Sequence, residues 1–438
     1  MAVPNSANAE GLRRLTTSMR QVVKRVLPPS VVDWLRRRLR PTPTSTARVV
    51  ERDPGPAEEY IIGLETRLWS TGRDTEVEKL TRSVGLTPRG SRARARGSMA
   101  LARWFFSQGR ADTALRRLEG VHPPNPSIQN EIDLLRVDCH CELGHAQEAL
   151  SYLSRMTGRG TREQNLLLRV GHTRSLLDLP RNHGSGPMIE ALNTAFADGG
   201  YRMIRRRSVN DAVGLGNIAC DVPLAEPRES LPLVTVLVSL EDADPDPYGG
   251  ISSLLNQSWR NLEILFVGGA EDRERLAAAD ESIFDDARVV FVSGDATDLW
   301  RAGLDHASGD MVTGHIYGSW AHPQRIEAQA RAMMADPMLQ ATVTSHLRVA
   351  PDLTPRPLGL APRPRLVGPN PNSTMIRLAG GSSDEAVAAV RRVLSRLSPL
   401  SGELKPPENV VLISDDVPLT LTVSTSPSHI PRTVGPPG

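Results

Sequence analysis

The clearest hydrophobic pattern in this sequence is a set of three short apolar runs in its second half. Val234–Val238, Leu262–Val267 and Val289–Val292 are rich in β-branched residues and alternate with stretches of helical character. This alternation predicts the parallel strands of an α/β sheet. Ligands bind beyond the carboxyl ends of such strands, so the residues after each run are the candidates for a functional site.

Upstream of these runs, the apolar residues follow helical spacing and repeat. The segments MALARWFFSQGRADTALRRL and DLLRVDCHCELGHAQEALSYL carry Gly109 and Gly144, and Ala114 and Ala149, at one spacing of 35 residues. The period and the order of small and large residues resemble the tetratricopeptide repeat. The resemblance implies helix pairs stacked into a short solenoid. Two roles stay open for this region: binding a protein partner, or bracing the next domain.

The first 40 residues combine an amphipathic pattern with many arginines. Apolar residues from Leu12 to Val26 share one helical face, and VVDWLRRRLR follows a proline pair. Two interpretations stay open: peripheral contact with an anionic membrane surface, or a helix that docks on the rest of the protein. No secretion signal follows Met1, and no apolar stretch reaches the roughly 18 residues that span a bilayer. We therefore expect a cytoplasmic protein, peripheral on the inner face of the cell membrane under the first interpretation.

Composition narrows the class of protein further. The chain has 438 residues, 39% of them hydrophobic, and its 35 Pro and 35 Gly indicate linkers between globular parts. A net charge of +2 gives no indication of a nucleic-acid partner. Three cysteines fit a reducing compartment. In Cys139-His140-Cys141 the two thiols would lie on different faces of a helix, so we expect buried side chains there rather than a metal site.

Four motifs between Pro232 and Pro337 carry a family resemblance. They are PLVTVLVS, SLLNQSWRNLEILFV, RAGLDHASGDMVTG and WAHPQRIEAQ, and SLLNQSWRNLEI is the most specific of them. Together they resemble the nucleotide-binding half of a family 2 glycosyltransferase, which has a GT-A fold. The resemblance implies an α/β, Rossmann-like GT-A domain that binds a nucleotide sugar. It further implies, by ancestry, sugar transfer in the synthesis of a cell-envelope polysaccharide or glycoconjugate, with Mg²⁺ or Mn²⁺ in an intact family member.

The sequence departs from this family where the family carries its acids. Gly268 and Gly269 replace an aspartate pair after the second strand, and Ile316 and Gly318 replace the metal-binding aspartates of an Asp-x-Asp-Asp-Trp motif. Hard divalent ions need oxygen ligands, and isoleucine and glycine side chains supply none. We therefore expect no metal site at these positions. The corresponding expectation for activity is that it is lost or impaired, as in a pseudoenzyme.

Other residues are candidates for nucleotide-sugar binding. They follow the strands or align with the motif: Glu241, Asp242, Asp295, Arg301, Ser319 and Trp320. Glu241 and Asp242 also fit a solvated acidic loop, and Asp295 fits a helix N-cap. His315 and His322 flank the motif and could supply metal-binding nitrogens, although His322-Pro323 is also typical of a helix start.

Asp384 and Glu385 are the candidates for a catalytic base. They follow NPNSTMIR, which is similar to a family strand, and inverting transferases need a carboxylate to take the proton of the acceptor hydroxyl. Ser382 or Ser383 offers another interpretation, in which a serine caps a helix and the acids favour its positive N-terminus.

Two functions from different classes remain at this point. One is the glycosyltransferase described above; the other is a non-catalytic scaffold or regulatory partner that assembles at a membrane surface through its helical repeats. The expected division of the chain is a basic arm (1–40), a linker (41–57), a helical tetratricopeptide-like domain (58–186), an adaptor (187–230), a GT-A domain (231–423) and a disordered tail (424–438).

Overall fold

A computed structural model describes most of the chain between residues 55 and 423. The described ranges are 55–123, 125–157, 164–182, 186–208, 214–221, 231–240, 248–279, 281–293, 299–350, 352–356, 367–369, 373–378, 410–412 and 418–423, with the single residues 211 and 388. The basic N-terminal arm and the tail 424–438 lie outside these ranges. Their expected roles therefore stay predictions.

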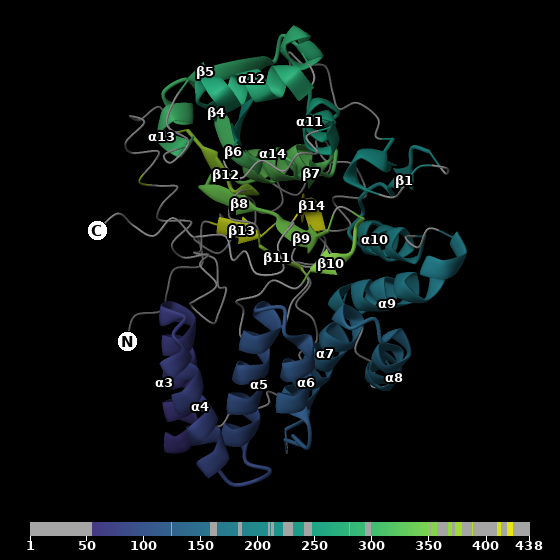
Figure 1. Cartoon of the computed structure of the whole chain (residues 1–438). Helices are drawn as coiled ribbons and strands as arrows, with labels where there is room; N and C mark the ends of the chain where they lie inside the picture. The colour runs from purple at the N-terminus through teal and green to yellow at the C-terminus, as the bar shows by residue number, and fades with distance from the viewer. Residues whose placement is uncertain are drawn as a thin grey trace, which may run out of the picture.

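Helices account for the chain from Pro56 to Asp198, at the lower side of Figure 1. They are α3 (Pro56–Thr71), α4 (Asp74–Leu86), α5 (Arg92–Ser107), α6 (Ala111–Leu118), α7 (Pro126–Glu142), α8 (Ala146–Thr157), α9 (Gln164–Asn182) and α10 (Gly186–Asp198). Helix α5 packs against α6, and α7 packs against α8. Gly109 and Gly144 lie in the two turns with φ of 71° and 74°, a left-handed conformation that glycine adopts without strain. The two landmark glycines thus have the same backbone role, while the tetratricopeptide resemblance itself stays a prediction.

Helix α7 separates two hydrophobic clusters of this helical region. Cys139 belongs to the first cluster, with Leu101 and Leu118. Cys141 belongs to the second, with Leu153. The two buried side chains belong to different clusters, which confirms that they lie on different faces of the helix.

Beyond α10 the chain forms a mixed seven-stranded sheet. Its strands are β3 (Val234–Ser239), β4 (Leu262–Gly268), β5 (Val289–Ser293), β6 (Met311–Ile316), β8 (Ala341–Val343), β12 (Met375–Arg377) and β13 (Val410–Leu412), in the spatial order β13-β8-β12-β6-β3-β4-β5. Strands β5, β4, β3 and β6 are parallel, and β12 is antiparallel to both of its neighbours. The three apolar runs of the sequence are strands β3, β4 and β5, as predicted.

Both faces of this sheet are covered, which explains why the central strands carry apolar side chains on both faces. On one face, Val236 and Val238 of β3 pack with Trp259 and with Ile326 of α14 (Arg325–Ala335). On the other face, Leu237 packs with Leu304 of α13 (Leu299–Leu304). Alternate residues of β3 thus support opposite layers, so a helix lies over each face of the sheet.

A second, smaller sheet connects the two parts of the molecule. It contains β7 (Trp320–Ala321), β9 (Ser345–Val349), β10 (Pro355–Arg356), β11 (Val367–Pro369) and β14 (Pro418–Val423), with the order β10-β9-β14-β7 and β11 paired to β9. Trp320 and Leu347 of this sheet share a hydrophobic cluster with Met188 and Phe196 of α10. The helical region therefore joins the strands through a common core. No helix among the described residues is long and apolar enough to cross a bilayer.

Candidate functional site

The carboxyl ends of the parallel strands meet at one edge of the large sheet. Strands β3, β4, β5 and β6 end at Ser239, Gly268, Ser293 and Ile316, in parallel register. Helix α11 (Tyr248–Leu255) follows β3 along the chain, and α12 (Ala270–Ala279) follows β4. In open α/β sheets ligands bind at such an edge, which makes it the candidate site. Helix N-termini carry partial positive charge, and α11 and α12 begin after two of these strands.

At the end of β4, the acid nearest to the glycine pair has a structural role. Asp272 Oδ2 accepts a hydrogen bond from the Gly269 N–H at 2.9 Å, and its other oxygen pairs with Arg275. This is the backbone half of a capping box at the start of α12. A Cβ atom at Gly268 would lie 2.7 Å from Asp272 Oδ2 and 3.0 Å from Leu240 Cδ1, so a side chain there would displace the cap.

The turn from β6 to β7 holds the residues that the sequence resemblance aligns with a metal-binding motif. Gly318 has φ of 80°, and Ser319 N–H donates to Ile316 O at 3.1 Å. Helix α11 packs closely against this turn at Gly250. A Cβ atom added at Gly250 would lie only 2.9 Å from Ser319 O. Ser253 of the same helix accepts from the Ala321 N–H at 2.9 Å. The space beside the turn on this side is therefore filled by α11.

His315 holds the same turn from the strand side. The Ser319 carbonyl can only accept, so His315 Nε2 carries the proton and donates to it at 2.9 Å. The side chain of His315 is 3% exposed, and burial together with the nearby Arg325 guanidinium lowers the pKa of His315 to about 3. Arg325 is itself fully buried and donates to Gly314 O at 3.2 Å. His315 is thus a neutral hydrogen-bond donor that fixes the turn, and it does not face a metal ligand set.

His322 is also engaged by the backbone. Its Nε2 donates to Arg202 O at 3.0 Å and its Nδ1 accepts from the Gln324 N–H at 3.1 Å. Burial lowers the pKa of His322 to about 4, so the ring is neutral at ordinary pH. Helix α14 begins at Arg325 with Gln324 as its N-cap, so His322 and Pro323 precede the helix instead of forming its first turn. The prediction that His322-Pro323 starts this helix is therefore wrong by about two residues.

The sequence candidates fall into three groups in the structure. Arg301 lies in α13 and is exposed. Ser319 and Trp320 are 1% and 3% exposed, and Trp320 packs in the cluster that joins β7 to α10. The remaining candidates lie outside the described residues: Glu241, Asp242, Asp295, Asp384 and Glu385. The roles of all these residues in nucleotide-sugar binding or catalysis stay predictions.

The described residues of the motif turn do not fit a divalent metal ion. The side chains of Ile316 and Gly318 supply no oxygen, and the buried Ser319 hydroxyl is the one side-chain oxygen at the positions that the resemblance aligns with acids. No cluster of three or more His, Cys, Asp or Glu side chains suitable for a metal occurs in the part of the chain that the structure describes. The described residues of this turn therefore offer no ligand set for Mg²⁺ or Mn²⁺.

Three residues of this edge have roles that the sequence did not indicate. Gly250 allows α11 to approach the turn, Ser253 binds the Ala321 N–H, and Arg325 lies buried beneath β6. The glycine pair Gly249-Gly250 at the start of a helix was a signal for close approach. Nothing in the local pattern of α14 distinguishes Arg325 from a solvated arginine.

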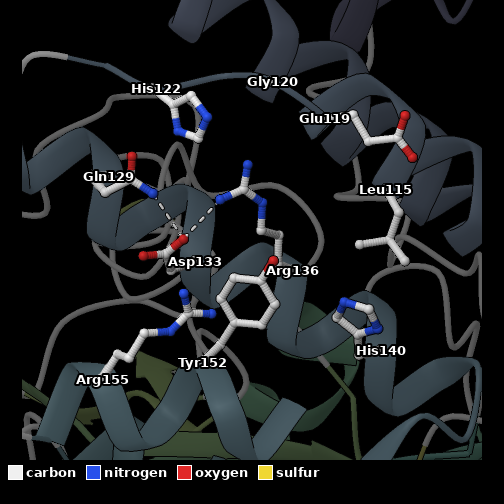
Figure 2. Close-up of a pocket in the computed structure, with 10 residues that line it drawn as sticks. All are labelled: Leu115, Glu119, Gly120, His122, Gln129, Asp133, Arg136, His140, Tyr152 and Arg155. Carbon is white, nitrogen blue, oxygen red and sulfur yellow. Dashed lines mark hydrogen bonds and ion pairs between the residues drawn. The ribbon is translucent and has the colours of Figure 1, made fainter. Parts of the chain in front are cut away.

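A second candidate site lies in the helical region (Figure 2). It is a pocket of about 530 Å³ lined by Leu115, Glu119, Gly120, His122, Gln129, Asp133, Arg136, His140, Tyr152 and Arg155. Asp133 accepts from Gln129 at 2.8 Å and from Arg136 at 3.0 Å. The Arg155 guanidinium lies 4.4 Å from the Tyr152 ring centre. The pocket thus offers hydrogen-bond donors, hydrogen-bond acceptors and an aromatic ring.

The parallel-rich sheet with a site at its carboxyl edge is consistent with a GT-A-like domain. No family model matches the chain. No curated protein matches it. Among solved structures, it is similar to the mannosyltransferase PcManGT from Pyrobaculum calidifontis in complex with GDP-Man and Mn²⁺, at 15% identity over 56% of this chain and 68% of that chain, with a TM-score of 0.27. It is also similar to glucosyl-3-phosphoglycerate synthase from M. tuberculosis, at 12% identity over 44% of this chain and 78% of that chain, with a TM-score of 0.24.

Proposed function

We propose that this chain is a glycosyltransferase-like protein that binds a nucleotide sugar at the carboxyl edge of β3, β4, β5 and β6. We further propose that its metal-dependent transfer is lost or strongly impaired, and that it acts in the synthesis of a cell-envelope polysaccharide or glycoconjugate. The observation that carries the proposal is the turn Ile316–Ser319, which occupies the motif position without a carboxylate and is packed against Gly250.

The chemical consequence follows from the charge of the leaving group. A departing nucleoside diphosphate develops negative charge, and removing the groups that stabilise such charge typically slows a reaction about a hundredfold or more. The N-termini of α11 and α12 favour phosphate oxygens by their partial positive charge. This contribution supports binding of the donor, but it is smaller than that of a divalent ion in direct contact. Asp384 and Glu385 remain the proposed bases for any residual transfer.

Thermal unfolding with UDP-sugars and GDP-sugars, with and without Mn²⁺, tests the proposal. A ligand at a hundred times its Kd should stabilise the fold by about 2.7 kcal/mol. We expect stabilisation by at least one nucleotide sugar, and we expect Mn²⁺ to leave it unchanged. Stabilisation that depends on Mn²⁺ would overturn the impaired metal site. Absence of stabilisation by every donor would overturn nucleotide-sugar binding itself.

A pair of variants locates the binding edge. Gly269 is exposed at the start of α12 and has room for a side chain, so Gly269→Trp should obstruct the edge while the fold is retained. Gly85 is exposed in α4 and has no heavy atom within 4 Å of an added Cβ, so Gly85→Trp is the matched control. Stabilisation by the nucleotide sugar should disappear in the first variant and persist in the second. Equal stabilisation in both would place the donor elsewhere.

The helical pocket favours a second candidate function, a non-catalytic scaffold or regulatory partner. Its lining is held in place without a ligand, because Arg136 also donates to Leu118 O at 2.6 Å at the end of α6. A peptide segment of a partner protein would bind between Leu115 and Tyr152. The test measures the amount of envelope polysaccharide or glycoconjugate in cells that express the chain. Under this second function, Tyr152→Ala should abolish the effect of the chain on that amount, whereas Gly269→Trp should retain it. The opposite result favours the donor site.

A further inference from the structure

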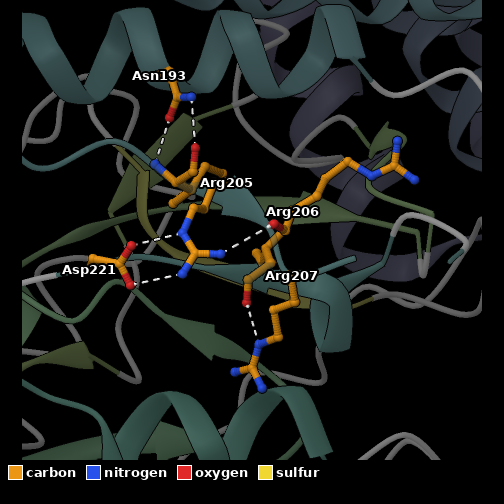
Figure 3. Close-up of polar contacts among 7 residues, drawn as sticks. Asn193, Arg205, Arg206, Arg207 and Asp221 are labelled. Atoms are coloured by element: carbon orange, nitrogen blue, oxygen red, sulfur yellow. Dashed lines mark hydrogen bonds and ion pairs between the residues drawn. The ribbon is translucent and has the colours of Figure 1, made fainter. Parts of the chain in front are cut away.

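A short two-stranded ribbon beside α11 concentrates positive charge. It is formed by β1 (Arg205–Arg206) and β2 (Ile218–Ala219), which pair in antiparallel register. The segment that enters it reads YRMIRRRS, from Tyr201 to Ser208, and holds four arginines in six residues. Three of them, Arg205, Arg206 and Arg207, are drawn in Figure 3.

The backbone of this segment is held by side chains from other elements. Asn193 of α10 accepts from the Ile204 N–H at 2.7 Å and donates to the Ile204 carbonyl at 2.9 Å. Arg202 N–H donates to Gln324 Oε1 at 2.8 Å, and Arg202 O accepts from His322. At the other end, Asn217 Oδ1 accepts from the Ser208 N–H at 2.9 Å. The backbone of this segment is therefore held in place before a ligand binds. Binding to it should cost little conformational entropy of the backbone.

The side chains on this backbone divide into one buried anchor and an exposed group. Ile204 is 3% exposed and packs in the cluster of α10 and the small sheet. Arg202, Arg205 and Arg207 are exposed, and Met203 between them is 63% exposed. The ribbon thus presents cationic side chains around one apolar side chain.

Among the described residues, one acid pairs with an arginine of the ribbon. Asp221 pairs with Arg205 through two hydrogen bonds of 2.8 and 3.1 Å, as Figure 3 shows. Arg207 donates to Ser252 of α11 and to Ile218 O, which are both uncharged partners. Arg206 donates to the backbone oxygen of Asp211. Between Tyr201 and Asp221 the sequence holds four arginines and two aspartates, so this segment has an excess of positive charge.

We propose that the segment Arg202–Arg207, which enters and forms one strand of the ribbon, docks the protein on an anionic membrane surface. Each arginine close to anionic headgroups contributes favourable electrostatic energy that decreases with salt, and an apolar side chain such as Met203 enters the interface. This contact is separate from the predicted role of residues 1–40 and goes beyond binding of a nucleotide sugar. Because Arg207 is linked to α11, docking here brings the α11 side of the sheet edge close to the bilayer.

The same surface is less suited to single-stranded nucleic acid. Such ligands bind by stacking bases on aromatic rings along a basic groove. Tyr201, the aromatic residue of the segment, packs edge-on against the His322 ring at a centroid distance of 5.7 Å. The exposed part of the ribbon therefore offers charge and an apolar side chain without a stacking platform.

Sedimentation of the full chain with vesicles tests this proposal. We expect binding to phosphatidylcholine vesicles that contain phosphatidylglycerol, weaker binding at high salt, and no binding to pure phosphatidylcholine. The double variant Arg202→Ser, Arg205→Ser should lower the affinity about tenfold. Asp221→Asn removes the acid that offsets Arg205 and should raise the affinity. Met203→Ser should weaken binding at every salt concentration.

The matched control removes the same charge from another exposed place. Arg82 in α4 and Arg89 after it are exposed, so Arg82→Ser, Arg89→Ser changes the net charge equally. Affinity that falls equally in both double variants would show a dependence on net charge alone and would overturn the ribbon as the docking site. Unchanged affinity of the ribbon variant for vesicles would also overturn the proposal. The same holds if the ribbon variant loses affinity for a fluorescent single-stranded RNA but keeps its affinity for vesicles.

Discussion

Buried charges in the helical region and in the sheet region are held in different ways. In the helical region, two buried arginines pair with carboxylates of other helices. Arg169 binds both oxygens of Asp138 at 2.7 and 2.8 Å, with exposed fractions of 1% and 5%. Arg103 pairs with Glu65 at 3.1 Å in the same manner between α3 and α5. Each of these contacts joins two helices through two side chains.

In the sheet region, polar side chains bind backbone carbonyls instead. His315 donates to Ser319 O, His322 donates to Arg202 O, and Arg325 donates to Gly314 O. Burial lowers the pKa of Arg325 to about 10, and no carboxylate of the described residues pairs with it. The comparison teaches that the turn at the candidate site is held by hydrogen bonds to backbone carbonyls, and that no described carboxylate takes part in them.

The largest effect is expected from breaking a buried pair of the helical region. Asp138→Asn leaves the Arg169 guanidinium buried without a counter-charge, and such a change costs about 3–5 kcal/mol. Urea unfolding followed by circular dichroism measures this difference. Asp112, which pairs with Arg116 on the surface of α6, is the control. Asp112→Asn should change the free energy of unfolding far less, because the surface pair is solvated. Equal effects would contradict a special role of buried pairs.

A pH titration of stability tests the neutral histidines of the sheet region. The unfolded chain takes up a proton on His322 near pH 6.5, whereas the folded ring does so only near pH 4. The free energy of unfolding should therefore be fully retained above pH 6.5 and decrease by about 1.4 kcal/mol per pH unit as the pH falls toward 4.

The measurement is a series of urea unfolding curves from pH 7 to pH 5. His322→Gln removes the titrating group, so the loss of stability over this range should be about 2 kcal/mol smaller in the variant. His315 should contribute in the same direction, because its pKa is lowered to about 3. A variant that loses stability as steeply as the original protein would argue against a buried neutral ring.

The strands could be predicted from the sequence, whereas the contacts that hold the site could not. Runs such as Leu262–Val267 predict buried parallel strands because both faces of the sheet are covered. The sequence alone also shows that Ile316 and Gly318 are not acids, because the spacing within the aligned motif assigns these two positions. These features depend on neighbours along the chain.

The remaining features depend on residues far apart in the sequence. Gly250 contacts the turn at Gly318 across nearly seventy residues, and Arg169 meets Asp138 across two helices. No local pattern encodes either distance. His322 illustrates the same limit, since its sequence context suggested a helix start while its ring binds the carbonyl of Arg202. Long-range packing decides the role of such residues.

An overpacking variant tests how closely α11 approaches the motif turn. Gly250→Ala places a Cβ atom about 3 Å from backbone atoms of Gly318 and Ser319, which cannot rotate away. We expect a loss of about 1–3 kcal/mol in the free energy of unfolding. Gly85→Ala in α4 meets no atom within 4 Å and should be neutral or slightly stabilising. If both variants are neutral, the turn is free to move away from α11.

The smallest effect is expected from removing the unpaired buried cation. Arg325→Met eliminates the desolvated guanidinium, keeps most of the side-chain volume and leaves no buried charge behind. We therefore expect the free energy of unfolding to change by no more than about 1 kcal/mol, in either direction. Arg169→Met is the matched variant in the helical region, and it should cost about 3–5 kcal/mol because Asp138 remains buried and unpaired. A large loss in Arg325→Met would mean that a counter-charge stabilises this guanidinium, and the difference between the two regions would disappear.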